Sequence, residues 1–202
     1  MPNRLMRHLL FAFALCAAAI SGCASAQGTN LVPVKAEMLE GSRLLLRTAG
    51  CSVDLPGRDW KWMTYEGGNQ NYICSNSNTG ALFLAAVGRL TGDLTAHQPQ
   101  SLLDNASKAI GARNGKLENG KFDWVELPGV KKCVRIAFNE VESSGKRTLA
   151  VIYLAQTIGD VSLKLQYTGP SASEPEPFKR MVDSLKMLPD SVAAPKTPKP
   201  KE

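Results

Sequence analysis

Two apolar stretches separated by only two residues limit the folds that this chain can adopt. Residues 148–158 read TLAVIYLAQTI and residues 161–168 read VSLKLQYT, with Gly159 and Asp160 between them. A connection this short joins antiparallel neighbours in a sheet. The first stretch is apolar on both faces, which predicts a central strand, and the second alternates, which predicts one core face and one solvent face. We therefore expect an antiparallel sheet with a buried central strand.

Shorter strand patterns fill much of the remaining chain, and turn signals separate them. The dipeptides at 56–57 and 128–129 are both Pro-Gly, and the Asn-Gly at 119–120 is typical of a tight hairpin. The run at 81–90, ALFLAAVGRL, is apolar enough to predict a strand that is buried on both faces. The other predicted strands lie at 44–46, 51–55, 60–65, 72–74, 122–127 and 132–138.

Two segments have helical periodicity. In the first, at 95–110, Thr95 and Gln98 match a capping box. In the second, Ser173 and Glu176 match the same pattern, and we expect the helix to continue to Pro189. The apolar stripe of this second helix consists of Phe178, Met181, Val182, Leu185 and Leu188.

These elements predict an α+β fold, in which an antiparallel β-sheet carries two packed helices in a layered α/β sandwich. We expect one domain, at 43–189, because the segments on either side lack a periodic apolar pattern. Residues 23–42 would form a tether. Residues 190–202 are rich in Pro and Lys, which predicts a disordered tail.

Three stretches of this domain resemble the PsbP-like, DcrB-like fold. They are residues 53–60 (VDLPGRDW), 163–170 (LKLQYTGP) and 178–189 (FKRMVDSLKMLP). The resemblance lies in the Pro-Gly-x-x-Trp turn, the Tyr near the end of the last strand and the Phe…Ser-Leu stripe of the last helix. Members of this fold serve as accessory subunits, partner-binding proteins and secretion adaptors. The resemblance therefore implies binding more than catalysis.

The N-terminal region has the features of an export signal. Arg4 and Arg7 precede an apolar run at 9–20, whose length is typical of a signal peptide and too short to span a bilayer. The run ends in Ile20-Ser21-Gly22-Cys23, which resembles a bacterial lipobox. The resemblance implies that residues 1–22 are a lipoprotein signal peptide and that the Cys23 thiol carries a diacylglycerol with fatty acyl chains such as palmitate.

The position of cleavage decides the expected location. Cleavage before Cys23 gives a lipid-anchored protein, and more than one acyl chain makes the anchor stable. In that case Ala24 stands where many lipoproteins retained at the inner membrane have Asp. The resemblance to lipoproteins then implies the periplasmic face of the outer membrane. The alternative is cleavage after Ala26, at an A-x-A site, which would give a soluble periplasmic or secreted protein.

The charge distribution does not indicate nucleic-acid binding. The net charge of +6 includes Arg4 and Arg7 of the signal region and Lys196, Lys199 and Lys201 of the tail. The rest of the chain is only mildly basic, and its Lys and Arg alternate with acidic residues. This pattern is typical of an ordinary solvated surface.

Cysteine usage agrees with export. No two cysteines form C-x-x-C, so a thioredoxin-like redox motif is absent from the sequence. An oxidising periplasm permits one disulfide among Cys51, Cys74 and Cys133, and three pairings are open. We predict a bond between Cys51 and Cys74, because each lies in a short strand-like stretch of the N-terminal half. Cys133 would then be a buried free thiol.

The inventory of reactive residues argues against catalysis. Beyond the signal region the sequence holds one histidine, His97, and a Ser-His-Asp triad or a Cys-His pair would have to use it. Closely spaced zinc ligands and nucleotide-binding glycine motifs do not occur. We therefore expect that the protein is not an enzyme and that it binds no cofactor and no metal ion. A hydrolase with an unrecognised site is the alternative.

One aromatic cluster is a candidate surface for a partner protein. Trp60 and Trp62 would share one face of a strand and lie close to Tyr65, although core filling is the other interpretation. With the resemblances above, the sequence predicts a non-catalytic binding or scaffolding role toward an envelope protein. A soluble adaptor or chaperone that shields apolar segments of its partners is a further alternative.

Overall fold

Antiparallel strands form two sheets in the computed structural model, which describes residues 30–66 and 70–189. The small sheet has the order β12 (Lys186–Met187), β4 (Cys51–Asp54), β3 (Arg43–Leu46) and β2 (Leu39–Glu40). The large sheet has, in spatial order, β1 (Leu31–Pro33), β5 (Trp60–Tyr65), β6 (Asn71–Asn76), β7 (Leu82–Arg89), β11 (Val161–Gly169), β10 (Arg147–Gln156), β9 (Lys132–Val141) and β8 (Lys116–Val125).

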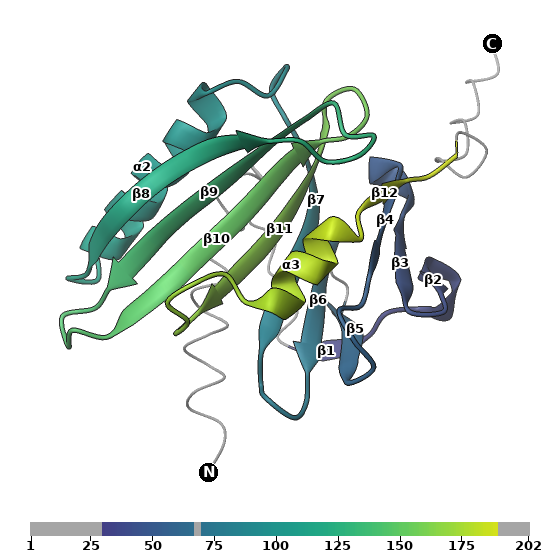
Figure 1. Cartoon of the computed structure of the whole chain (residues 1–202), viewed down its shortest axis with the longest axis horizontal. Coiled ribbons are helices and arrows are strands. Elements are labelled where there is room, and N and C mark those ends of the chain that lie inside the picture. The colour runs from purple at the N-terminus through teal and green to yellow at the C-terminus, as the bar shows by residue number, and fades with distance from the viewer. Residues whose placement is uncertain (1–29, 67–69, 190–202) are drawn as a thin grey trace.

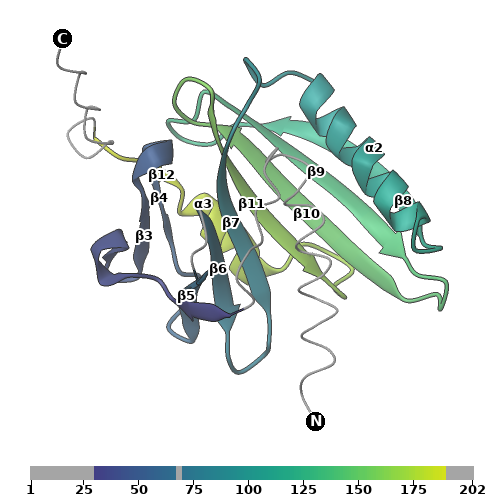
Figure 2. The ribbon, with the colours of Figure 1, turned by 180° about the vertical axis from the view of Figure 1, so that it is seen from behind.

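The two helices lie on opposite faces of the large sheet. Figure 2 shows α2 (His97–Gly111) over β8 and β9, whereas Figure 1 shows α3 (Glu176–Asp183) over the other face, beside the small sheet. Short 3-10 turns, η1 (Ala36–Met38) and η2 (Arg47–Ala49), flank the first strands of the small sheet. The expected α+β fold, an antiparallel β-sheet with two packed helices in layers, is therefore confirmed.

The central strand β10 contributes to both cores, as its sequence predicts. Ile152 and Leu154 pack against α2, and Leu149 and Val151 point to the other face, where they pack against α3 and the small sheet. Strand β11 pairs with β10 from Leu149 opposite Gly169 to Gln156 opposite Ser162. A strand that is buried on both faces needs apolar residues at successive positions, and residues 149–155 provide them.

The solvent face that the alternation of β11 predicts does not exist. Ser162, Lys164 and Gln166 are all buried, although their alternation with Leu163 and Leu165 is typical of a half-solvated strand. The alternation itself is correct, because the two leucines point into the core beneath α3. The polar side chains occupy the opposite face of the sheet.

The Asn-Gly dipeptide lies within a strand and does not form the expected hairpin. Strand β8 continues through Asn119 and Gly120, and its register to β9 shifts between Glu118 and Lys121. Asn119 has a φ of +56°, which Asn tolerates better than most residues. The left-handed residue therefore produces a bulge in an edge strand, because β9 continues to pair on both sides of it.

Both predicted helices exist, but their ends differ from the sequence expectation. Before α2 the backbone N–H and the hydroxyl of Thr95 both donate to Gln98 Oε1 at 2.8 Å, but the N-cap residue is Ala96 without a side-chain cap, so only half of the expected capping box forms. Helix α3 begins after Pro175 without a side-chain cap, so the capping box of Ser173 and Glu176 does not form. It ends at Asp183, more than one turn early, because Ser184 Oγ accepts from the Asp54 N–H at 2.9 Å and the chain then pairs with β4.

Several expectations concern residues outside the described ranges. The signal peptide at 1–22, the lipidation site Cys23 and the tail at 190–202 all lie there. Of the expected tether, residues 31–40 form β1, η1 and β2. Within residues 30–66 and 70–189, no helix is both long and apolar enough to cross a membrane.

Candidate functional site

The tryptophans that the sequence suggested for a partner surface belong to the core. Trp60 stacks on Phe83 with 4.5 Å between ring centroids, and Trp62 Nε1 donates to the Ser42 carbonyl oxygen at 3.2 Å. Both side chains are buried between the two sheets. Tyr65 is separated from both tryptophans by an odd number of positions, so it lies on the opposite face of β5. There it is half-buried and packs against a second apolar cluster. These three residues therefore form no common surface.

The structure does not contain the predicted disulfide between Cys51 and Cys74. Both residues are free thiols, and so is Cys133. Cys51 lies on the small sheet and Cys74 on the large sheet, and both pack in the core between them. Spacing along the chain does not determine whether two such thiols meet in disulfide geometry. Burial raises the pKa of Cys51 and of Cys133 to about 12, which disfavours the reactive thiolate.

The described residues hold no metal-binding cluster. No three His, Cys, Asp or Glu side chains within residues 30–66 and 70–189 come close enough to bind a metal ion. His97 is exposed at the first position of α2. Asp54 forms an ion pair with Arg43, whose Nε lies 2.8 Å from Asp54 Oδ1. His97 is thus solvated, and Asp54 has a structural role in an ion pair.

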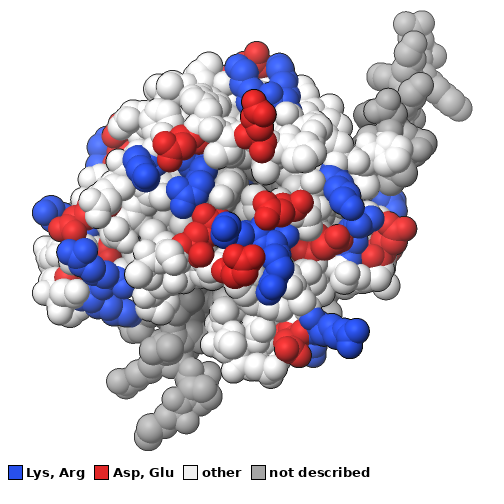
Figure 3. Space-filling view, viewed as in Figure 1, with Lys and Arg blue, Asp and Glu red and all other residues white. Residues whose placement is uncertain are grey.

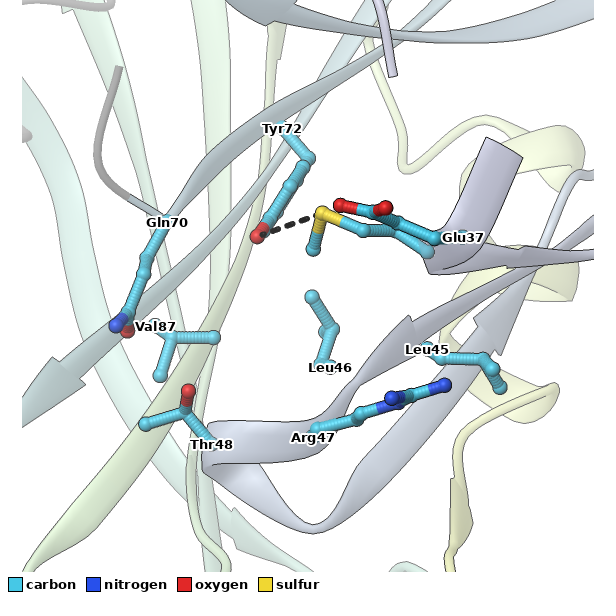
Figure 4. A pocket seen from close by; sticks show the side chains of 9 residues that line it. Glu37, Leu45, Leu46, Arg47, Thr48, Gln70, Tyr72 and Val87 are labelled. Carbon is cyan, nitrogen blue, oxygen red and sulfur yellow. Dashed lines mark hydrogen bonds between the residues drawn. The ribbon is translucent and has the colours of Figure 1, made fainter. Parts of the chain in front are cut away.

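A pocket of about 300 Å³ lies where the small sheet meets the large one, and it is the candidate binding site (Figure 4). Residues from η1, β3 and η2 form one wall, and Gln70 with residues from β6 and β7 forms the other. Its volume is at the lower end of the range for small-ligand sites. The lining residues are Glu37, Met38, Leu45, Leu46, Arg47, Thr48, Gln70, Tyr72 and Val87.

The pocket has an apolar floor and a polar rim. Leu46 and Tyr72 are buried and Val87 is half-buried, whereas Glu37 and Thr48 at the mouth are exposed. The Tyr72 hydroxyl donates to Met38 Sδ at 3.9 Å, across the upper side of the pocket in Figure 4. Burial raises the pKa of Tyr72, so its hydroxyl stays protonated and serves as a donor. The pocket can therefore hold a small apolar group whose attached polar atoms meet the rim.

Gln70 closes one side of the pocket through its backbone. Its φ is +58°, and its carbonyl oxygen accepts a hydrogen bond from the Val87 N–H at 2.9 Å. This bond ties the residue to β7, on the wall opposite η2. The pocket residues of η1 were not predicted from the sequence, because that segment was expected to be a tether without a fixed position.

Charges of both signs are mixed on the face of the molecule seen in Figure 3. Lys and Arg alternate there with Asp and Glu, and ion pairs account for part of the pattern. One of them joins Arg135 Nε to Glu174 Oε2 at 3.0 Å. A face without a large field of one sign does not favour binding to a polyanion.

Comparison with known proteins relates this architecture to one fold. No protein-family model matches the sequence, and no curated protein matches it significantly. The structure is similar to the solution structure of cyanobacterial PsbP (CyanoP) from Synechocystis sp. PCC 6803, with a TM-score of 0.53 and 9% identity over 84% of this chain and 99% of that chain. The domain has a PsbP-like fold.

A second similar structure comes from another bacterium. The crystal structure of a protein from Bacteroides thetaiotaomicron VPI-5482 has a TM-score of 0.51 and 13% identity over 76% of this chain. The chain spans 50% of the length of that protein. At these identities the similarity concerns the PsbP-like fold alone, and the site has to be argued from its own residues.

Proposed function

We propose that this chain is a lipid-anchored protein of the cell envelope, at the periplasmic face of the outer membrane, whose PsbP-like domain binds a partner protein without catalysing a reaction. The pocket between the small sheet and β6–β7 carries the binding part of this proposal. The lipobox that ends in Cys23 supports the anchor. A lipid at that position would hold the domain at the membrane surface through the residues that precede β1.

The chemistry of the pocket favours a side chain of a partner protein as the bound group. Leu46 and Val87 offer an apolar floor, and Glu37, Thr48 and Gln70 surround the opening with groups that can donate and accept hydrogen bonds. An inserted apolar side chain would bury its surface on the floor, while its backbone would meet polar atoms at the rim. This arrangement is that of a small interaction site.

The enzyme alternative has little support in the described part of the chain. A nucleophilic cysteine needs a lowered pKa, and burial has the opposite effect on Cys51 and Cys133. His97, the histidine that a hydrolase would need, is exposed on a helix start that the pocket does not include. A soluble adaptor would use the same pocket and would differ only in lacking the lipid.

The anchor is tested by mass spectrometry of the processed N-terminus and by membrane fractionation. We expect a mature chain that begins at an acylated Cys23, and we expect Cys23→Ser to lose membrane association. Separation of inner from outer membranes locates the anchored form. A mature chain that begins at Gln27 without acyl mass would contradict the lipoprotein hypothesis and favour the soluble adaptor.

The binding role is tested by photo-crosslinking in intact envelopes. A photoreactive phenylalanine at Thr48, which is exposed at the pocket mouth, should capture a specific partner protein. The same amino acid at Ser107, which is exposed on α2, is the matched control. In addition, Thr48→Trp should fill the mouth and abolish complex formation without unfolding the protein. Identical crosslinks from both positions would contradict a pocket-directed interaction.

A further inference from the structure

Apart from the pocket, one face of the large sheet has a property that the described elements do not explain. On the side of the sheet that carries α2, strands β5, β6 and β7 present an apolar cluster, which we call the β5–β7 cluster. Ile73 and Leu84 within it are only 2% and 3% exposed. The cluster consists of Leu31, Met63, Tyr65, Ile73, Leu82, Leu84 and Ala86.

A stripe of buried polar residues borders this cluster on the next strand. Ser162, Lys164 and Gln166 of β11 lie on the same side of the sheet and are 1%, 3% and 1% exposed. The side-chain Nε2 of Gln166 donates to Thr168 Oγ1 at 3.2 Å, but its Oε1 has no hydrogen-bond partner in the structure. A buried acceptor without a donor is costly, which points to a binding group that lies against this stripe.

The described elements leave this part of the sheet uncovered. Helix α2 packs on β8 and β9, at the other end of the same side, as Figure 2 shows. Between residues 30 and 189, apart from the gap at 67–69, no helix or strand lies over β5, β6 and β7 on that side. Side chains that are excluded from water nevertheless require a cover.

We propose that this face is a docking surface for a polypeptide segment, and that its occupant is the chain's own apolar segment at 9–20. The described chain starts at Asn30, immediately before β1, which is the edge strand of the large sheet at this end. Leu31 of β1 is itself part of the β5–β7 cluster. The preceding segment, LLFAFALCAAAI, offers apolar side chains that match the cluster in character.

The distances allow this docking. Crossing from β1 to β11 takes four strand spacings, or about 20 Å. The residues that join Ile20 to Asn30 span about 30 Å when extended. The tail at 190–202 is a poorer occupant, because the chain leaves toward it from β12 of the small sheet and because it is rich in Pro and Lys.

The polar stripe favours a polypeptide over a lipid. Gln166 Oε1 needs a hydrogen-bond donor, and a peptide offers backbone N–H groups beside apolar side chains. An acyl chain has no donor and would leave this oxygen unpaired. One consequence rests on the proposed function: cleavage before Cys23 would remove the occupant and free the face for an apolar segment of a partner.

Intramolecular photo-crosslinking in the full chain tests the docking. The chain is produced without export, so that residues 1–22 stay attached, and Tyr65 of the β5–β7 cluster is replaced by a photoreactive phenylalanine. We expect crosslinks within the monomer to peptides from 9–20. The same replacement at Trp124, which is exposed on β8, should not give them. Crosslinks from position 65 to 190–202, or none within the monomer, would overturn the proposal.

A second measurement uses paired lysine substitutions in the full chain. Phe11→Lys with Phe13→Lys should weaken docking, so that backbone amides of β6 and β7 lose protection from hydrogen exchange and binding of an apolar dye increases. Val192→Lys with Ala193→Lys in the tail is the matched control and should change neither. Equal responses of the two variants would contradict the assignment of 9–20. Because this test needs neither Cys23 lipidation nor the pocket, its failure is distinct from failure of the proposed function.

Discussion

Glu174 and Arg135 form an ion pair that ties the approach to α3 onto the large sheet. Arg135 Nε on β9 lies 3.0 Å from Glu174 Oε2, and the hydroxyl of Tyr153 on β10 donates to the same oxygen at 3.3 Å. The carboxylate side chain is only 9% exposed, and that of Arg135 is 24% exposed. Burial, followed by the negative charge of Glu174, raises the pKa of Tyr153, so the phenol remains a donor.

We expect Glu174→Gln to destabilise the domain, because it leaves the guanidinium of Arg135 without its counter-charge. The loss should be about 2 kcal/mol, which is below the value for a fully buried pair because Arg135 keeps some contact with water. Urea denaturation measures the change. Glu176→Gln is the matched control, since that residue is exposed and lies 3.9 Å from Lys179, and it should cost less than about 0.5 kcal/mol. Equal effects of the two substitutions would contradict a structural role for the pair.

Leu185→Ala should destabilise the domain although Leu185 lies outside α3. The side chain is 2% exposed and packs in the core between the sheets. Removing its methyl groups should lower the free energy of unfolding by about 2–5 kcal/mol. Truncation after Pro189 is the comparison and should leave the melting temperature almost unchanged. If Leu185→Ala did not change the free energy of unfolding, Leu185 would not be a core residue.

The stability of the reduced protein should fall as the pH rises above about 9. Burial raises the pKa of Cys51 and of Cys133 from 9.0 to about 12, so the folded state keeps protons that the unfolded state releases. The unfolded state then binds fewer protons, and each thiol lowers the free energy of unfolding by about 1.4 kcal/mol per pH unit between these values. Urea midpoints at several pH values, with a reductant present, measure the slope.

Cys133→Ala provides the control for this pH dependence. The free energy of unfolding of the variant should still fall as the pH rises, but its slope against pH should be smaller by the contribution of one thiol. Native protein at pH 8 should also react slowly with thiol reagents, because burial disfavours the thiolate. A slope that does not respond to Cys133→Ala would mean that other groups cause the decline.

Asn119 should tolerate glycine but not a β-branched residue. Its φ of +56° lies in the left-handed region, which Gly adopts freely and Val does not. We expect Asn119→Gly to be nearly neutral and Asn119→Val to cost about 1–2 kcal/mol. Thermal unfolding compares the two. If both variants were equally stable, the bulge in β8 would not depend on this residue.

The accuracy of the sequence predictions differed between elements for physical reasons. Strand β10 and helix α2 were predictable because their patterns are local: continuous apolar residues indicate a doubly buried strand, and Thr95 with Gln98 starts a helix. The end of α3 was not, because Ser184 bonds to a residue 130 positions away. The pocket was missed for the same reason, since η1 and β7 approach each other only in the folded chain.

The fold class follows from the sequence, because the spacing of apolar residues and turns leaves antiparallel pairing as the way to bury them. The sequence also contains, at residues 20–23, a local motif that resembles a lipobox, so lipidation of Cys23 stays a prediction. The tertiary structure alone decided that Trp60 and Trp62 fill the core and that the polar face of β11 is buried. Alternation along a strand assigns residues to two faces, but which face is covered depends on elements that are distant in the sequence.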